Sequence, residues 1–357
     1  MESQFSLDQQ NNRADIPQNS VNNLNQSAIL NETKSGSINP SFNSANNIMT
    51  TSMSNTLDFE KLPKMSVARC SHGVIAYDNK LFIIGGYDRG ECLDVCEVYD
   101  PATNTIERIE SMVNRRGRAA ITWFQKENSI YAMGGSDGHE DLNSIECYSL
   151  EKRTWTSIKF DFELSCSNLG TISCSNFIYL VGLKGDGGKS LSRSSCLKYN
   201  PTENTFIRMG ELIHGRSQSA LVIVPFKSRS ANNSNEMIDK LSPAESCNSF
   251  HLYVFGGHDQ IRCLSTCEIY DPKEDKWSLI TGMHESRRGC GAAYHSYSHS
   301  IYIVGGTNGS QSLKSVEIYN TLTKRWSMGP DLNIARTNVA IAFIGIELDF
   351  LYYVITY

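Results

Sequence analysis

Paired glycines that return about every 50 residues constrain this chain more than any other feature of its sequence. Each pair closes a short apolar run. A tyrosine follows the first glycine by 14 residues in four copies and by 17 in the third, and a large apolar residue stands seven residues after every tyrosine. The first glycines are Gly85, Gly134, Gly182, Gly256 and Gly305, the tyrosines are Tyr99, Tyr148, Tyr199, Tyr270 and Tyr319, and the apolar residues are Ile106, Trp155, Phe206, Trp277 and Trp326. A unit of this size cannot bury both of its faces alone, so consecutive units must pack on one another.

The units have the pattern of β-structure throughout. After Thr56, short strands of alternating or wholly apolar character are separated by Gly, Asn and Asp turns, and helical periodicity is nowhere sustained. A repeat of this length with four strands is typical of a β-propeller, in which each unit forms one blade. The sequence therefore predicts an all-β fold.

The same residues resemble the kelch-repeat family. The paired glycines, the Tyr-Asp-Pro triplets at Tyr99–Pro101 and Tyr270–Pro272, and the Tyr to Trp spacing of seven are similar to kelch motifs over about residues 56–355. Stretches such as GGYDRGECLDVCEVYDP look most like the propellers of kelch-like proteins. The resemblance implies a six-bladed kelch β-propeller with an incomplete last blade. The sequence departs from the family pattern at Leu183, which replaces the second glycine of the third pair, and at Thr356-Tyr357, where the last pair should stand.

Residues 1–55 differ in composition from the rest of the chain. They are rich in Asn, Ser and Gln and contain only Phe5 and Phe42 as aromatic residues, so they offer too little apolar surface to offset the entropy of ordering. We expect a disordered low-complexity segment there and a propeller over residues 56–357. The expected repeats are about 63–110, 111–159, 160–209, 210–281 and 282–328, with a partial repeat at 329–357 and an inserted loop at 227–248.

Charge and cysteine content exclude several classes of protein. A net charge of −5 and a pI near 5.9 disfavour nucleic-acid binding through bulk phosphate attraction, and no apolar run is long enough for a membrane-spanning helix. Eleven cysteines without Cys-x-x-Cys spacing, and an N-terminus without signal-peptide character, favour reduced thiols in the cytosol or nucleus. Cys96, Cys196 and Cys267 each stand three residues before a repeat tyrosine, so we interpret them as small apolar packing residues.

Two motifs that suggest ligand chemistry are better explained as turns. Gly182–Ser190 resembles a phosphate-binding loop, but its glycine spacing is one residue too long and no helix is expected after it. His295 and His299 are four residues apart in an expected turn whose neighbourhood offers no further metal ligand. We therefore expect neither a cofactor nor a metal site.

The order of the strands decides which loops share a face. With four antiparallel strands per blade, a to d from centre to rim, the b–c turns and the d–a links lie at one end of the propeller, and the a–b and c–d turns at the other. We call the first end the loop face. Its b–c turns offer Tyr87, Arg89, Ser136, His139, His258, Gln260, Thr307 and Asn308, and its d–a links carry the recurring arginines Arg69, Arg116, Arg216, Arg287 and Arg336, with Arg118 beside the second.

Two interpretations of the recurring arginines are open at this point. They either anchor neighbouring blades through ion pairs or form an exposed basic rosette that binds an acidic peptide. Exposed ion pairs contribute only about 0–1 kcal/mol, whereas hydrogen bonds to a charged partner group contribute about 1.5–3 kcal/mol. This comparison favours partner binding, as does the usual placement of recognition residues on loops.

The family resemblance implies how such a face is used. In related kelch-like substrate adaptors, residues after the paired glycines and arginines of the links line the partner site, and the match is best at Tyr87, Arg118, Ser136, His258 and Thr307. We therefore predict a protein-recognition module without enzyme activity.

Related kelch-like proteins often carry BTB and BACK domains that join a cullin ubiquitin ligase. Residues 1–55 are too short and too polar for either domain, so a ligase role would need another chain or a longer isoform. Two alternatives stay open. The first is an actin-associated scaffold, and the second is a propeller enzyme with a central metal or carbohydrate site.

Overall fold

The computed structural model describes residues 63–164, 167–183, 194–226, 249–344 and 351–355. The chain divides into two compact units, residues 1–57 and 58–357, and all described residues belong to the second. The expectations for residues 1–55 and for the insert at 227–248 therefore concern residues outside those described. Within the described part, the only helix is a 3₁₀ turn at Gln125–Glu127, and no helix could cross a membrane.

Five four-stranded antiparallel sheets account for most of the described residues, and each follows the predicted order from centre to rim. The first contains β1 (Gly73–Tyr77), β2 (Lys80–Ile84), β5 (Cys96–Asp100) and β6 (Thr105–Ile109), with a small hairpin of β3 (Tyr87–Asp88) and β4 (Glu91–Cys92) at its b–c turn. The second contains β7 (Ala120–Phe124), β8 (Ser129–Met133), β9 (Ile145–Ser149) and β10 (Thr154–Ile158), and the third β11 (Gly170–Cys174), β12 (Phe177–Val181), β13 (Cys196–Asn200) and β14 (Thr205–Arg208). The fourth contains β15 (Ala220–Pro225), β16 (Phe250–Phe255), β17 (Cys267–Asp271) and β18 (Lys276–Ile280), and the fifth β19 (Gly291–His295), β20 (Ser300–Val304), β21 (Val316–Asn320) and β22 (Arg325–Met328).

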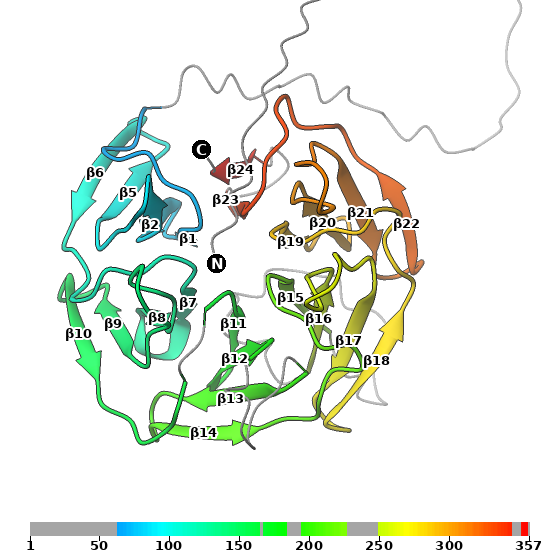
Figure 1. The fold of residues 1–357 in the computed structure, drawn as a ribbon, viewed down its shortest axis with the longest axis horizontal. Coiled ribbons are helices and arrows are strands. Elements are labelled where there is room, and N and C mark those ends of the chain that lie inside the picture. The colour runs from blue at the N-terminus through cyan, green and yellow to red at the C-terminus, as the bar shows by residue number, and fades with distance from the viewer. Residues whose placement is uncertain (1–62, 165–166, 184–193, 227–248, 345–350, 356–357) are drawn as a thin grey trace, which may run out of the picture. The chain divides into compact units, whose positions relative to one another are not determined.

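The innermost strands of these sheets follow one another around a ring. β1 contacts β7, β7 contacts β11, and the series continues through β15 and β19, as Figure 1 shows. A two-stranded sheet of β23 (Ala340–Ile344) and β24 (Leu351–Ile355) comes next, and β23 contacts both β19 and β1. The prediction of an all-β propeller is confirmed with five complete blades. The two-stranded sheet lies where the incomplete last blade was predicted, and a sixth blade is not confirmed among the described residues.

The tyrosine of each repeat and the large apolar residue seven positions later face each other across strands c and d. Tyr270 is directly opposite Trp277 in the register of β17 and β18, with ring centroids 5.2 Å apart, and the spacing of seven residues follows from this hairpin register. The Trp277 ring also reaches the preceding blade, because its Nε1 donates to the carbonyl oxygen of Gly210 at 3.0 Å. Trp155 and Trp326 make the same kind of bond, to the carbonyl oxygens of Glu110 and Thr281.

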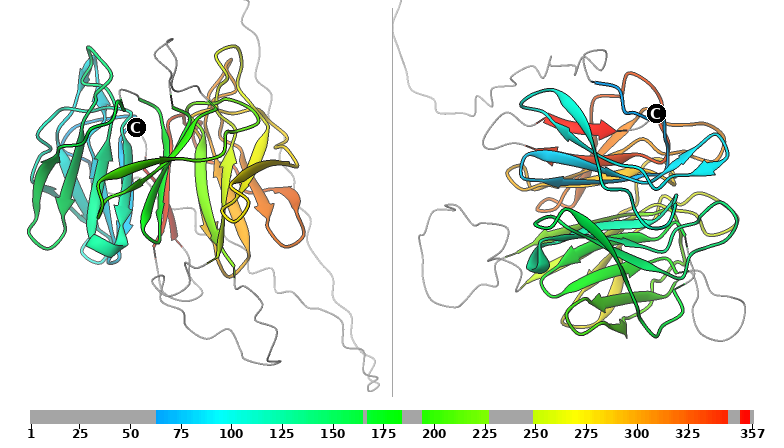
Figure 2. Two further views of the ribbon diagram at one scale, coloured as in Figure 1. Left: turned by 90° about the horizontal axis from the view of Figure 1, so that it is seen from below. Right: turned by 90° about the vertical axis from the view of Figure 1, so that its left-hand side faces the viewer.

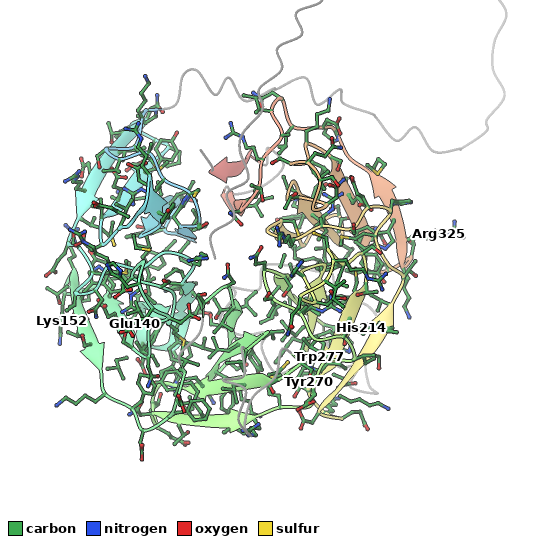
Figure 3. All side chains as sticks on the ribbon, in the orientation of Figure 1. Glu140, Lys152, His214, Tyr270, Trp277 and Arg325 are labelled. Carbon is green, nitrogen blue, oxygen red and sulfur yellow. The ribbon has the colours of Figure 1, made fainter. Side chains whose placement is uncertain are left out.

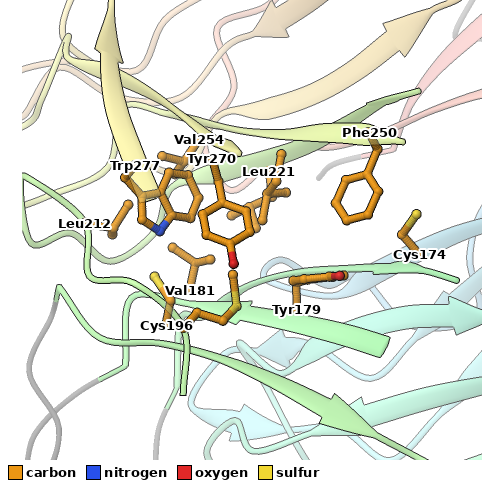
Figure 4. Close-up of a cluster of buried hydrophobic side chains, with 12 residues drawn as sticks. Cys174, Tyr179, Val181, Cys196, Leu212, Leu221, Phe250, Val254, Tyr270 and Trp277 are labelled. Atoms are coloured by element: carbon orange, nitrogen blue, oxygen red, sulfur yellow. The ribbon is translucent and has the colours of Figure 1, made fainter. Parts of the chain in front are cut away.

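The hydrophobic core lies between blades. Figure 4 shows the cluster at the boundary of the third and fourth blades, where Trp277 and Tyr270 pack with Tyr179, Val181 and Cys196. Trp277 is only 2% exposed. Burial therefore couples each blade to its neighbour, as the repeat argument requires.

Four of the five recurring arginines are buried, which corrects the expected rosette. Arg69, Arg116, Arg216 and Arg287 are at most 2% exposed. Each guanidinium group pairs with a buried glutamate on strand c, namely Glu97, Glu146, Glu268 and Glu317 respectively. The anchoring interpretation of these four residues is the one that the geometry supports, and their guanidinium groups are not available to a partner in this structure. The fifth arginine, Arg336, is half-buried.

Each buried arginine also binds the backbone of its own blade. Nη1 of Arg216 donates to the carbonyl oxygens of Gly256 at 2.7 Å and Thr266 at 2.8 Å, while Nη2 donates to Oε1 of Glu268 at 2.5 Å. The backbone amides of Ile213 and His214 donate to the same carboxylate. These hydrogen bonds offset the free-energy cost of removing the two charged groups from water.

The paired glycines link consecutive blades through the backbone of these arginines. The amide of Gly257 in the fourth blade donates to the carbonyl oxygen of Arg287 in the fifth at 2.8 Å. A Cβ on Gly256 would stand 2.2 Å from that oxygen, and a Cβ on Gly182 would stand 2.3 Å from the carbonyl oxygen of Arg216. The first glycine of a pair is therefore sterically required. Leu183, which replaces a second glycine, is instead fully buried in the core.

The third blade shows what replaces the ion pair. Leu197 occupies the strand-c position that holds glutamate in the other four complete blades, and it is fully buried. An apolar side chain is thus compatible with this site when the arginine is absent as well.

Replacing Trp277 with alanine should lower the free energy of unfolding by about 3–5 kcal/mol, because the change opens a cavity between two blades and removes an interblade hydrogen bond. Urea denaturation of the purified protein measures the effect. Leu279→Ala on the same strand is the matched control. Its side chain is 52% exposed, so its cost should stay within about 0.5 kcal/mol. Equal midpoints for Trp277→Ala and the wild type would contradict the core assignment.

Arg216→Met should destabilise the protein by about 3–5 kcal/mol, because it leaves the carboxylate of Glu268 buried without its counter-ion. Adding Glu268→Leu should restore much of the loss, since Leu197 already fills the corresponding site of the third blade. Both variants are compared by denaturation with Arg262→Met, whose parent side chain is 79% exposed. A double variant as unstable as Arg216→Met would show that the pair is not coupled in this way.

Candidate partner-binding face

The b–c turns and d–a links lie at the same end of the propeller, because all strands within each complete blade pair antiparallel. In side view the blade strands run between two ends of the ring where the connecting loops gather (Figure 2). Short bridges join a b–c turn to the d–a link that precedes the same blade, such as Ser217 to His258 and Arg288 to Thr307. The loop face is thus hydrogen-bonded to the blades beneath it.

The b–c turns are held by a side chain at their second position. Oδ1 of Asp259 accepts bonds from the amides of Ile261 at 3.0 Å and Arg262 at 2.9 Å, and Asp137 and Asn308 do the same in the second and fifth blades. The bonds from the backbone of Arg262 and Ile261 hold the pKa of Asp259 below its ordinary value. The carboxylate is therefore turned toward its own loop, and the residues that follow it project into solvent.

A second set of bonds joins the blades around the centre of the loop face. The residue two places after each recurring arginine adopts a left-handed conformation, with φ between 53° and 58° at Ser71, Arg118, Gln218, Gly289 and Asn338. Asn168, at the equivalent position of the third blade, has a φ of 63°. The amide of Arg118 donates to the carbonyl oxygen of Ser71, and the pattern repeats from Asn168 to Arg118, from Gln218 to Asn168 and from Gly289 to Gln218. We call these six positions the mouth residues. Hydrogen bonds between these residues hold the backbone just before the innermost strands.

The predicted site residues divide by exposure. Arg89, Arg118, His139 and Gln260 are exposed, as is Tyr87 at 38%, while His258, Thr307, Asn308 and Arg336 are half-buried. Ser136 is 5% exposed and its hydroxyl oxygen accepts a bond from the amide of Gly138, so it shapes the turn instead of facing a partner. Thr307 has a similar bond to Gly309.

Sequence reasoning missed several residues that the loop face exposes. They are the apolar Val113 (64% exposed), Ile213 (51%), Ile261 (89%) and Ile334 (59%), the exposed Arg262, and the half-buried Arg288. Val113 and Ile213 directly follow the buried Met112 and Leu212. The sequence signal that could have found them is an apolar residue at a loop position where other repeats have a polar one.

Histidines of two d–a links touch the buried glutamates. Nδ1 of His284 lies 2.9 Å from Oε2 of Glu317, and His214 lies 4.0 Å from Glu268. Burial alone would raise the pKa of Glu317, but hydrogen bonds from the backbone and ring of His284, together with Arg287, hold that pKa below its ordinary value. Figure 3 labels His214 on the fourth blade and Glu140 on the second. These links are therefore anchored by charge as well as by backbone bonds.

The thiols of Cys96 and Cys267 lie in the core. Burial raises the pKa of Cys96 and of Cys267 to about 12, and both side chains are fully buried, as expected for packing residues. His295, one of the two spaced histidines, has its Nδ1 2.7 Å from the hydroxyl of Ser298. Across the described ranges, no three His, Cys, Asp or Glu side chains gather as a metal site would require.

Comparison with known proteins matches these repeats to a family. The family model described as the Kelch motif matches residues 68–112, 126–159, 251–284 and 288–333. These segments fall in the first, second, fourth and fifth blades, which are the blades that contain the buried arginine–glutamate pair.

Curated relatives are similar over the same region. Kelch-like protein 26 of Danio rerio is 26% identical over 65% of this chain and 35% of its own length. The Kelch repeat and BTB domain-containing protein 1 of cowpox virus is 26% identical over 60% of this chain and 42% of its own length. The Influenza virus NS1A-binding protein homolog B of Danio rerio is 42% identical over 83 residues, 23% of this chain and 13% of its own length.

The chain thus spans well under half the length of these relatives. The repeat spacing, the blade topology and the matched motifs agree with one another. The chain contains kelch motifs, and the repeats that carry them fold into blades of a β-propeller.

Proposed function

We propose that this propeller is a protein-recognition module that binds its partner on the loop face. One observation carries the proposal. Of the ten exposed large apolar side chains among the described residues, five lie on loop-face segments and only two on the turns of the opposite end. The five are Tyr87, Val113, Ile213, Ile261 and Ile334, the two are Tyr297 and Leu322, and the other three are on outer strands. Apolar side chains gathered on one face of a folded domain favour a protein partner.

The similarity to kelch-like proteins supports the same function at the level of the family. The relative from Danio rerio that carries the name NS1A-binding protein is named for a protein ligand. A role as the substrate-recognition part of a cullin ubiquitin ligase is a narrower proposal. On the described residues, no observation favours an actin-associated scaffold or a central metal or carbohydrate site over this function.

Site-specific photo-crosslinking tests which face binds. A photoreactive phenylalanine analogue placed at Tyr87 or Ile213 of the full chain should give covalent adducts with cellular proteins, because partner atoms come within bonding distance there. The same analogue at Tyr297 or Leu322 is the control, since these side chains are at least as exposed, at 66% and 68%. Mass spectrometry of the adducts compares the two faces. Adducts formed mainly at the control positions would contradict the proposed face.

A further inference from the structure

We infer that the fifth blade contacts the surface of an anionic lipid membrane through its turns at the end of the ring opposite the loop face. These are the a–b turn between β19 and β20 and the c–d turn between β21 and β22. The contact surface, which we call the fifth-blade surface, consists of Tyr297, Leu322, Lys324 and Arg325. The inference goes beyond the proposed function, because it concerns the other end of the ring.

Two large apolar side chains protrude from the two turns of this blade. Tyr297 is 66% exposed and Leu322 is 68% exposed. Among the described residues, no other turn at this end of the ring exposes a large apolar side chain. Both the amide and the hydroxyl of Thr321 donate to the carbonyl oxygen of His299, at 2.8 and 2.9 Å. These bonds join the two turns, so the two apolar side chains belong to one surface.

Polar side chains hold each of the two turns in place. Oδ1 of Asn320 accepts hydrogen bonds from the amides of Leu322 at 3.1 Å and Thr323 at 2.8 Å. In the other turn, Nδ1 of His295 lies 2.7 Å from the hydroxyl oxygen of Ser298. An apolar side chain on a turn that is already fixed can be buried with little further loss of backbone entropy.

The two turns carry positive charge without any carboxylate. Lys324 and Arg325 are both exposed, and neither His295–Ser300 nor Asn320–Arg325 contains an Asp or a Glu. In the other four complete blades, the described turns at this end contain at least one carboxylate each, namely that of Asp78, Glu127, Glu203 or Glu274.

Exposed lysines on those turns are accompanied by negative charge. Lys126, Lys152 and Lys273 each stand beside a glutamate in the chain. The fifth blade therefore combines exposed apolar side chains with positive charge that no neighbouring carboxylate of the same turns reduces. This combination matches a surface that is apolar inside and negatively charged at its headgroups.

The placement of the apolar side chains favours a lipid interface over a protein partner. Figure 2 shows the blade strands ending in turns at this end of the ring, and both side chains stand on such turns. A protein must offer a pocket to each protruding side chain, whereas a lipid interface accommodates side chains of any shape. The tyrosine ring suits the interface because its hydroxyl stays hydrated while its ring is buried. A contact of this kind needs no spanning segment.

Flotation of the purified full chain with lipid vesicles tests the inference. Vesicles of phosphatidylcholine and phosphatidylserine at a ratio of about 7:3 should bind the protein, and vesicles of phosphatidylcholine alone should bind it about tenfold less, because basic residues are attracted to the anionic lipid. Added salt should release the protein from the mixed vesicles. Absence of binding to the mixed vesicles would overturn the inference.

A variant of the apolar pair identifies the face that meets the lipid. Tyr297→Ser with Leu322→Ser should lower binding to the mixed vesicles by about tenfold or more, because it removes the apolar area that the lipid buries. Val113→Ser with Ile334→Ser is the matched control, since these side chains are 64% and 59% exposed on the loop face. The control should bind as the wild type does. Unchanged melting temperatures establish that both variants are folded.

A second pair of variants tests the role of charge. Lys324→Gln with Arg325→Gln should abolish the preference for phosphatidylserine, because it removes both cations of the fifth-blade surface. Lys152→Gln with Arg153→Gln changes exposed cations on the c–d turn of the second blade, which lies across the ring in Figure 1, and should keep the preference.

The other outcomes all count against the inference. If the apolar variant binds the mixed vesicles as the wild type does, the lipid contact lies elsewhere on the molecule and the fifth-blade surface is wrong. The same conclusion follows if the loop-face control is the variant that loses binding. If vesicles are not bound and photo-crosslinking at Tyr297 yields a protein adduct, this surface takes a protein partner and the lipid assignment fails.

Discussion

A buried arginine that binds a glutamate and a glycine carbonyl is the interaction on which the propeller depends. Apolar packing between blades is strong but not directional, so by itself it does not set how one blade meets the next. The guanidinium group of Arg216 fixes the b–c turn and strand c of its own blade, while the backbone of the next arginine, Arg287, receives the second glycine amide. The same few atoms therefore define the turn inside a blade and the junction between blades.

This arrangement also holds the loops of the loop face in place. The d–a links are held from below by the buried glutamates, and the b–c turns are held by Asp137, Asp259 and Asn308. Loops fixed in this way can expose a side chain such as Ile261 without collapsing around it. The ion pairs that are inaccessible to a partner thus support the residues that are accessible.

Much of the scaffold could be predicted from the sequence, because its determinants repeat. The spacing of seven between Tyr270 and Trp277 is a direct product of hairpin register, and the interval between glycine pairs is the length of a blade. The interpretation of Arg216 went wrong because spacing cannot distinguish a side chain that turns inward from one that turns outward. In the third blade the arginine is absent and Leu197 replaces the glutamate. This joint replacement was evidence that the two side chains meet inside the blade. The arginine and the glutamate recur together in four of the five complete blades, as a shared structural constraint requires.

The exposed residues on which the proposed face rests could not be found in the same way, because they are exceptions to the repeat. Ile261 and Arg262 stand where the b–c turns of the first, second and fifth blades have Gly90 and Glu91, His139 and Glu140, and Ser310 and Gln311. How far such a side chain is exposed is known only from the three-dimensional structure. Residues that depart from the repeat pattern are therefore the ones whose exposure on the structure should be checked first.

The mouth residues have a consequence for how such a protein can diversify. The bonds that join five of these positions from blade to blade use backbone atoms alone, and the side chains there are those of Ser71, Arg118, Asn168, Gln218 and Gly289. In the next link the amide of Val339 donates to the carbonyl oxygen of Gly289. A hydroxyl, a guanidinium group, amides and a glycine thus occupy equivalent places on one backbone conformation. The side chains at the centre of the face can therefore differ from blade to blade without a change in these bonds, except at Gly289, where a Cβ would stand 2.7 Å from Oδ1 of Asn338.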